Sequence, residues 1–132
     1  MKLKLGSATV TSEWVPPAEL PDLTKAKTIA IDVETRDPNL KKMGPGWARG
    51  DGEVVGYAVA TADWAGYVPI RHAGGGNIDE KQVNKWLKKV FDCPADKIMH
   101  NAQYDLGWIK RMGFNMKGRV IDTMVAASLL DE

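Results

Sequence analysis

Two acidic residues at the end of an apolar stretch are the strongest chemical signal in this sequence. Residues 28–34 are Thr-Ile-Ala-Ile-Asp-Val-Glu, a pattern that predicts a short buried strand ending in Asp32 and Glu34. Alternate side chains of a strand share a face, so the Cα atoms of these two acids are about 7 Å apart. Such a pair is stable when a cation lies between the carboxylates, when one carboxylate is protonated, or when the strand ends in solvent.

A third acid can join this pair through the fold. Residues 97–100 predict a second short buried strand, and a helix follows at about 101–112. Asp105 falls in the first turn of that helix, where the helix dipole favours an anion. If the two strands are neighbours, Asp105 arrives near Asp32 and Glu34, at the carboxyl ends where open α/β sheets bind ligands. Three converging carboxylates predict a divalent metal site, and hard oxygen ligands favour Mg²⁺ or Mn²⁺.

The remaining pattern places these acids in one α/β domain. Alternating apolar residues predict a hairpin of strands at 53–62 and 65–70 and a last strand at 119–122. An apolar stripe at helical spacing predicts a helix over 79–92, and we expect Asp122 to cap a final helix. The resulting order, β-β-β-α-β-α-β-α, indicates an α/β fold with a mixed sheet led by a hairpin.

Two segments fall outside these elements. Residues 1–25 combine a weakly alternating stretch with three prolines, so we expect an N-terminal arm and lead-in before a domain at 26–132. Residues 35–52 are rich in Gly and Pro and predict a long unstructured loop. Trp47 in this loop either stacks on a base or plugs the loop against the domain. Three basic residues of the loop can meet a bound phosphate or only keep it soluble: Lys41, Lys42 and Arg49.

Composition excludes several classes of protein. With 132 residues, 44% hydrophobic and 27% charged, the chain fits one ordinary domain with its own core. A formal net charge of +1 indicates no particular class of partner. The single Cys93 cannot form an internal disulfide, and no apolar run is long enough for a membrane span. We therefore expect a cytoplasmic protein.

Taken together, the motifs resemble the proofreading 3′–5′ exonuclease domain of family A DNA polymerases, the bacterial DNA polymerase I and phage polymerase type. The first motif of that domain, Asp-x-Glu-Thr, matches residues 32–35. The second, Asn-x-x-x-Asp with an aromatic residue before the Asp, matches 101–105, and supporting stretches lie at 67–70 and 121–124. The resemblance covers roughly residues 26–131 and implies a ribonuclease-H-like fold.

This resemblance implies two-metal hydrolysis of the 3′-terminal phosphodiester of single-stranded DNA, releasing 5′-mononucleotides with Mg²⁺ or Mn²⁺. By matching position, Asp32 would bridge both metals, Glu34 would ligate the water-activating metal, and Asp105 would hold the second. The substrate-binding positions implied in the same way are Thr35, Asn101, Tyr104 and Leu40. The side chain of Asn101 fits a plain helix N-cap equally well.

The third motif of that family, Tyr- or His-x-x-x-Asp on a later helix, is absent from the sequence. The chain thus resembles a domain truncated before its last helices, whose fourth acid would come from a polymerase domain or another chain. We expect little or no nuclease activity from this fragment alone, in the cytoplasm of a bacterial or phage-infected cell. Two other hypotheses stay open: a non-catalytic nucleic-acid-binding or polymerase-associated module of the same fold, and a ribonuclease-D-like RNA exonuclease.

Overall fold

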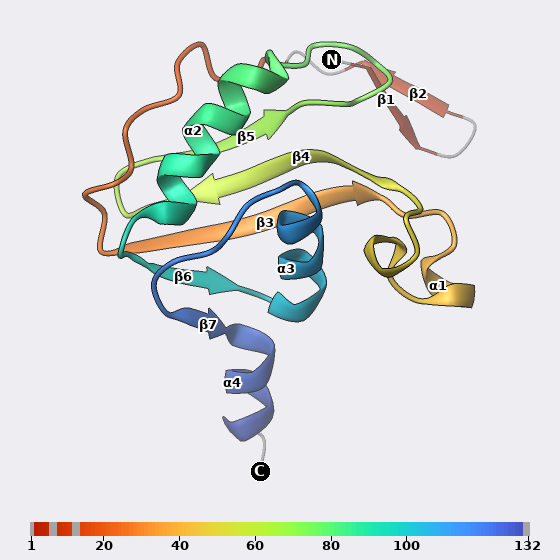
Figure 1. Ribbon diagram of the computed structural model, residues 1–132. Helices are drawn as coiled ribbons and strands as arrows, with labels where there is room; N and C mark the ends of the chain where they lie inside the picture. The colour runs from red at the N-terminus through yellow and green to blue at the C-terminus, as the bar shows by residue number, and fades with distance from the viewer. Residues whose placement is uncertain (1, 6–7, 12–13, 131–132) are drawn as a thin grey trace.

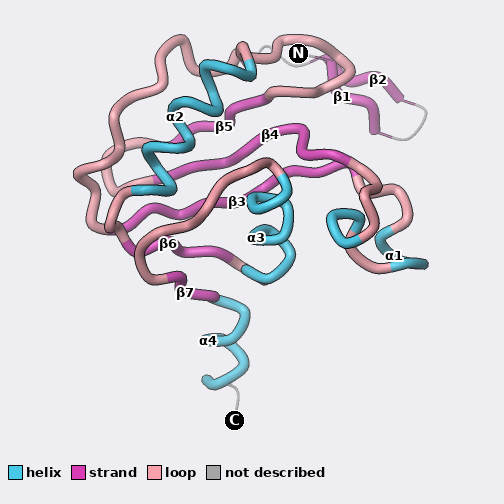
Figure 2. The backbone as a smooth tube through the Cα atoms, in the orientation of Figure 1, coloured by secondary structure: helices cyan, strands magenta, loops and turns pink. Residues whose placement is uncertain are grey.

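The computed structural model describes residues 2–5, 8–11 and 14–130, so the last two residues of the predicted domain lie outside it. Its centre is a five-stranded mixed sheet in the spatial order β5-β4-β3-β6-β7 (Figures 1 and 2). Strand β3 in the middle pairs antiparallel with β4 and parallel with β6. The strands are β3 (Thr28–Arg36), β4 (Glu53–Ala60), β5 (Ala65–Pro69), β6 (Asp96–Met99) and β7 (Val120–Asp122). From β3 onward the predicted element order is confirmed, apart from two short helical turns between β3 and β4.

Helices α2 (Glu80–Asp92) and α3 (Ala102–Arg111) lie over the same face of this sheet (Figure 1). Helix α2 begins where the Asp79 carboxylate accepts a hydrogen bond from the Gln82 N–H at 3.1 Å. Its buried side chains are the predicted apolar stripe: Val83, Trp86, Leu87, Val90 and Phe91. Within the described residues, no helix has the length and apolarity that crossing a bilayer requires.

Strand β3 separates a packed face from an acidic one. Ile29, Ile31 and Val33 are buried beneath the helices, with exposed fractions of 0%, 3% and 5%. Asp32 and Glu34 point to the opposite face and are exposed. The alternation therefore gives one strand both a share of the core and a pair of accessible carboxylates, as the sequence predicts.

Lys97 of β6 is fully buried on the packed side. Its ammonium group donates hydrogen bonds to the backbone carbonyls of Lys117 at 2.6 Å, Phe91 at 3.4 Å and Cys93. Two of these carbonyls belong to the C-terminal end of α2, where a cation is favoured. Lys97 thus ties the end of α2 to the segment that leads into β7.

The prediction of an unstructured loop at 35–52 is wrong. Strand β3 continues to Arg36, and the segment contains the short helix α1 (Leu40–Met43) and the 3₁₀ turn η1 (Gly46–Ala48). Asp37 accepts from the Gly46 N–H at 3.0 Å, and Arg49 pairs with Asp51 at 3.2 Å. These short-range polar contacts order the segment, and one of them engages Arg49, a candidate for phosphate binding.

Trp47 of η1 packs against α3. A Cβ atom at Gly107 of α3 would overlap the indole ring, so the missing side chain of that glycine makes room for the tryptophan. Trp47 belongs to the partly buried residues that pack on the core. Of the two interpretations of Trp47, the plug is confirmed.

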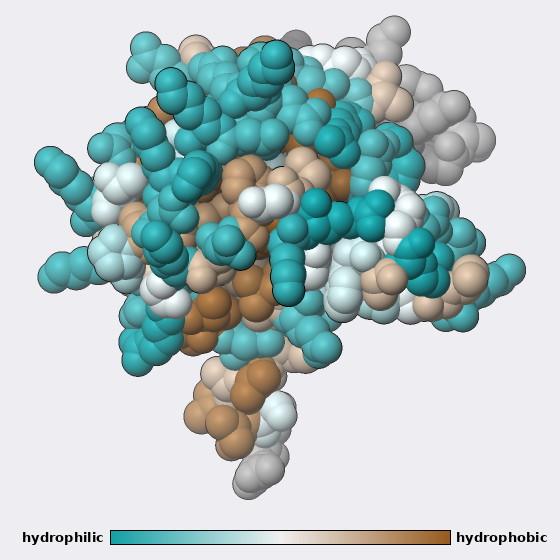
Figure 3. Space-filling view, in the orientation of Figure 1, coloured by the Kyte–Doolittle hydropathy of each residue, from teal (hydrophilic) through white to brown (hydrophobic). Residues whose placement is uncertain are grey.

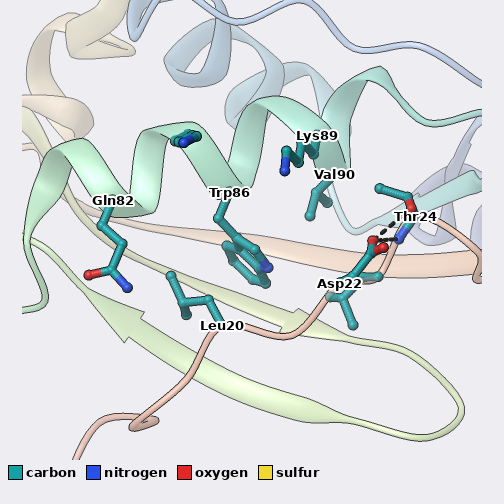
Figure 4. Close-up of a pocket in the computed structure, with 9 residues that line it drawn as sticks. Leu20, Asp22, Thr24, Gln82, Trp86, Lys89 and Val90 are labelled. Carbon is teal, nitrogen blue, oxygen red and sulfur yellow. Dashed lines mark hydrogen bonds between the residues drawn. The ribbon is translucent and has the colours of Figure 1, made fainter.

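The N-terminal segment stands apart from the central sheet. Strands β1 (Lys2–Leu5) and β2 (Ala8–Thr11) pair with each other in a separate two-stranded sheet, so neither of them is an edge strand of the main one. The lead-in then crosses α2, where the Trp86 indole N–H donates to the carbonyl of Pro21 at 2.6 Å. Figure 4 shows Leu20 beside the Trp86 ring at this contact, in a pocket of about 240 Å³.

Candidate acidic active site

Asp32 and Glu34 of β3 lie opposite very small residues of β4. In the register of β3 and β4, Asp32 lies opposite Ala58, and Glu34 lies opposite Gly56. Directly opposed residues are the nearest neighbours on a sheet face. Because these neighbours have almost no side chain, both carboxylates stay open to ligands on the exposed face.

Asp105 approaches the same strand from α3. Strand β6 pairs with β3 only as far as Ala30, which leaves the edge of β3 beyond that residue open. The first turn of α3 lies at this open edge, and the Asp105 carboxylate accepts a hydrogen bond from the Val33 N–H at 3.2 Å. The structure therefore brings the third predicted acid to the strand that carries the other two.

The electrostatics of the three acids are unfavourable without a cation. Asp105 is only 4% exposed, and this burial, assisted by the charges of Asp32 and Glu34, raises its pKa to about 7 despite the Val33 N–H. Burial and the charge of Asp32 also raise the pKa of Glu34. Perturbed carboxyls of this kind cluster at functional sites. A bound cation would relieve the repulsion, and the all-oxygen donor set suits Mg²⁺ or Mn²⁺.

The three acids do not form a preformed metal-binding site. No group of three or more His, Cys, Asp or Glu side chains in the described part of the chain is disposed to hold an ion. The three-acid metal centre therefore stays a prediction.

Helix α3 starts in an unusual way. Asn101 has φ 55° and ψ 59°, the only positive φ among the described residues other than glycine. Asn101 occupies the N-cap position of α3, as predicted, but its side chain makes no capping hydrogen bond. Instead, Asp122 of β7 accepts from the N–H groups of Asn101 at 3.0 Å and Ala102 at 2.9 Å. The exposed Asn101 side chain remains a candidate for substrate contact.

Thr35 and Tyr104 are engaged within the protein. Their hydroxyl oxygens are 2.9 Å apart, and the Tyr104 hydroxyl also donates to Asp37 at 2.9 Å. These bonds fasten α3 to the end of β3. Leu40 begins α1, beyond the end of β3, and is 39% exposed. Substrate contact by these three residues stays a prediction.

Tyr67 also borders the acids, and the site prediction lacks both this residue and its partner His72. Tyr67 lies opposite Ala58, which places it two strands from Asp32 on the same face. Its hydroxyl shares a hydrogen bond with His72 Nε2. Burial, followed by the charges of Glu34 and Asp32, raises the pKa of Tyr67 to about 12. The sequence signal was only the supporting stretch at 67–70, which carries no information on this pairing.

The acidic face continues into an open groove. The groove has a volume of about 680 Å³, and its lining includes Asp32, Ala58, Ala60, Tyr67, Ile98 and His100. Thr123, the first residue of α4 (Thr123–Leu130), also borders it. Helix α4 projects from the body with exposed apolar side chains (Figures 1 and 3), among them Leu129 at 66% and Leu130 at 86%.

Comparison with known proteins connects this geometry to a family. A sequence model described as 3′–5′ exonuclease matches residues 17–132. A DNA-directed DNA polymerase of Pseudomonas phage M6 is 41% identical over 116 residues, which cover 83% of this chain and 17% of the relative. A DNA polymerase I of Borreliella burgdorferi is 28% identical over 110 residues, covering 83% of this chain and 11% of the relative. The chain thus spans less than a fifth of these relatives.

Solved structures share the fold at low sequence identity. Brucella melitensis NrnC with bound Mg²⁺ has a TM-score of 0.55 at 19% identity, covering 87% of this chain and 50% of the other. The Aedes aegypti Nibbler EXO domain has a TM-score of 0.55 at 16% identity, covering 84% and 50%. These neighbours confirm the predicted ribonuclease-H-like fold.

Proposed function

The chain belongs to the 3′–5′ exonuclease family found in DNA polymerases, and we propose that Asp32, Glu34 and Asp105 form the metal-binding part of its nuclease centre. The observation that carries this proposal is the hydrogen bond from the Val33 N–H to Asp105, which brings a buried acid beside two others. Three carboxylates at one edge of a sheet raise each other's pKa unless a cation neutralises them. The substrate is the 3′ end of single-stranded DNA, cut to release 5′-mononucleotides.

The family uses divalent metals, and we propose Mg²⁺ or Mn²⁺ here, with two ions in the complete site. The NrnC structure that shares the fold contains bound Mg²⁺. When bound, such ions lower the pKa of the attacking water and stabilise charge on the attacking and leaving oxygens. In this assignment Asp32 would help to hold both ions, Glu34 would hold the ion that activates water, and Asp105 would hold the other.

The centre needs a fourth acid and a group that orients water. We propose that a polypeptide segment carrying them, from a polymerase domain or from another chain, packs in the groove beside Asp32. The groove lies next to that acid, and α4, whose first residue Thr123 borders the groove, offers exposed apolar side chains as a further packing surface. Residues 26–132 are then the partial nuclease domain, 1–25 its arm, and the cytoplasm of a bacterial or phage-infected cell its location.

Calorimetric titration with Mn²⁺ and a nuclease assay test this proposal together. The protein should bind Mn²⁺, Asp32→Ala should abolish that binding, and a 5′-labelled single strand should be shortened slowly or not at all. Asp63→Ala removes an exposed acid from the turn between β4 and β5 and is the matched control. Absence of Mn²⁺ binding, or binding that survives Asp32→Ala, would contradict the assigned site.

The same 5′-labelled single strand also tests the two other hypotheses, a non-catalytic binding module and a ribonuclease-D-like RNA exonuclease. A non-catalytic binding module would retard the strand on a gel and never shorten it, even when the missing segment is supplied. A ribonuclease-D-like enzyme would shorten the RNA of the same sequence faster than the DNA, because contacts to the 2′-hydroxyl separate the two substrates. We expect the DNA strand to be preferred.

A further inference from the structure

The carboxylate of Asp122 caps two helices beside the acidic face. Asp122, the last residue of β7, accepts hydrogen bonds from the N–H groups of Asn101 at 3.0 Å, Ala102 at 2.9 Å and Met124 at 3.0 Å. The last of these bonds caps α4, as the sequence predicts. The first two cap α3 from 20 and 21 residues away, and no local sequence pattern indicates them.

The sheet places Asp122 where it can do this. Strand β7 runs parallel to β6, with Asp122 beside Met99, so its side chain reaches the chain where β6 passes into α3. A second brace lies next to it, because the Thr123 hydroxyl bonds to His100 Nδ1 at 2.9 Å and to the Met99 carbonyl at 3.3 Å. The turn between β6 and α3 is thus held from β7.

This turn decides where Asp105 lies. Asn101 has a left-handed conformation, which asparagine adopts more readily than most residues with a Cβ atom, and the bond from its N–H to Asp122 holds it there. From there α3 begins at Ala102, and Asp105, in its first turn, meets the Val33 N–H. The three backbone N–H groups also lower the pKa of Asp122, which keeps its carboxylate charged and the bonds strong.

We propose that Asp122 is a positioning residue for the metal site: by fixing the first turn of α3, it holds the Asp105 carboxylate against β3. This assignment rests on the proposed function for its catalytic meaning, but its geometric content can be tested on the metal-free protein. The Val33 N–H is the reporter, because its hydrogen-bond acceptor is the carboxylate whose position is in question.

Asp79→Ala supplies the matched control for Asp122→Ala. Asp79 is also an aspartate that caps a helix through a backbone N–H, but it serves α2, which carries none of the proposed metal-binding acids. Both substitutions remove an N-cap and lower the stability of the fold. Only loss of Asp122 should displace Asp105.

The experiment measures amide hydrogen exchange at Val33 without metal and Mn²⁺ affinity by titration. In Asp122→Ala we expect Val33 to exchange at least about 10-fold faster and Mn²⁺ to bind about 10-fold more weakly, the range found for outer-shell residues of metal sites. Asp79→Ala should leave both quantities within about twofold of the parent protein. If Asp122→Ala does not fold, Asp122→Asn keeps one acceptor oxygen and should show a smaller change in the same direction.

The outcomes separate this inference from the proposed function. Unchanged exchange at Val33 in the Asp122 variants, or equal acceleration in Asp79→Ala, overturns the positioning role. Failure of the parent protein to bind Mn²⁺ overturns the assigned metal site, and the exchange at Val33 then decides the positioning role by itself.

Discussion

Lys97 and Asp105 are the two charged side chains that are buried in the described part of the structure, and their surroundings differ. The Lys97 ammonium has three backbone carbonyls as acceptors. Asp105 accepts one backbone N–H, and its charged neighbours are Asp32 and Glu34, which carry the same sign.

The difference separates a buried charge that supports the fold from one that we propose to be functional. A buried charge with a complete set of hydrogen bonds joins segments and contributes to the fold. A buried acid surrounded by other acids weakens the metal-free fold, and it becomes favourable only when a cation binds. The same fold therefore holds one buried charge that its hydrogen bonds stabilise and one that a cation would neutralise in the proposed metal site.

The largest effect on stability is expected from removing the buried charge of Lys97. Lys97→Met keeps the length of the side chain but removes the donor from the carbonyls of Cys93 and Lys117, whereas the Phe91 carbonyl keeps its bond from the Lys117 N–H. The free energy of unfolding should therefore fall by about 2–4 kcal/mol. Denaturant unfolding measures this. Lys81→Met, at an exposed position of α2, should change stability by less than about 0.5 kcal/mol. If Lys97→Met were as stable as Lys81→Met, the proposed structural role of Lys97 would be contradicted.

Removing the charge of Asp105 should have the opposite effect and raise the free energy of unfolding. Asp105→Asn keeps an acceptor for the Val33 N–H and removes the repelling charge, so at pH 8 without metal the free energy of unfolding should rise by on the order of 2 kcal/mol. Added Mn²⁺ should raise the melting temperature of the parent protein and leave that of the variant unchanged. Destabilisation by Asp105→Asn would place Asp105 with Lys97 as a structural charge.

The raised pKa of Asp105 predicts a pH signature for the same pair of proteins. The folded state keeps the Asp105 proton up to about pH 7, whereas the unfolded chain releases it near pH 4. Between these values the folded state binds more protons, so this carboxyl costs the parent protein stability as the pH rises. The advantage of Asp105→Asn should therefore grow from about pH 4 to pH 7. A constant difference across that range would contradict the raised pKa.

A smaller effect tests the residue next to Asp105. Tyr104→Phe removes the bonds to Thr35 and Asp37 and should lower the free energy of unfolding by about 1 kcal/mol. Thr35→Val removes one of these bonds and should cost less. If Tyr104→Phe leaves stability unchanged but weakens binding of single-stranded DNA, Tyr104 belongs to the site and not to the scaffold.

The sequence by itself determined the order of the main elements along the chain and the common face of Asp32 and Glu34. Alternation in β3 assigned Asp32 and Glu34 to one face, and the stripe of α2 assigned the core, because periods of 2 and 3.6 residues are local properties of the backbone. The position of Asp105 followed from one topological assumption, that β6 neighbours β3, which the pairing confirms. The Asp-x-Glu-Thr and Asn-x-x-x-Asp motifs led to the family.

Only the tertiary structure decided what depends on contacts between distant residues. The loop at 35–52 is ordered because Trp47 fills the space above Gly107 and Asp37 meets the hydroxyl of Tyr104. The start of α3 is held by Asp122, and Lys97 is buried because carbonyls from the end of α2 and from Lys117 converge on its ammonium group. A carboxylate or an ammonium group has no preferred partner along the sequence. Its role is set by which donors, acceptors and charges the fold brings within a few ångströms.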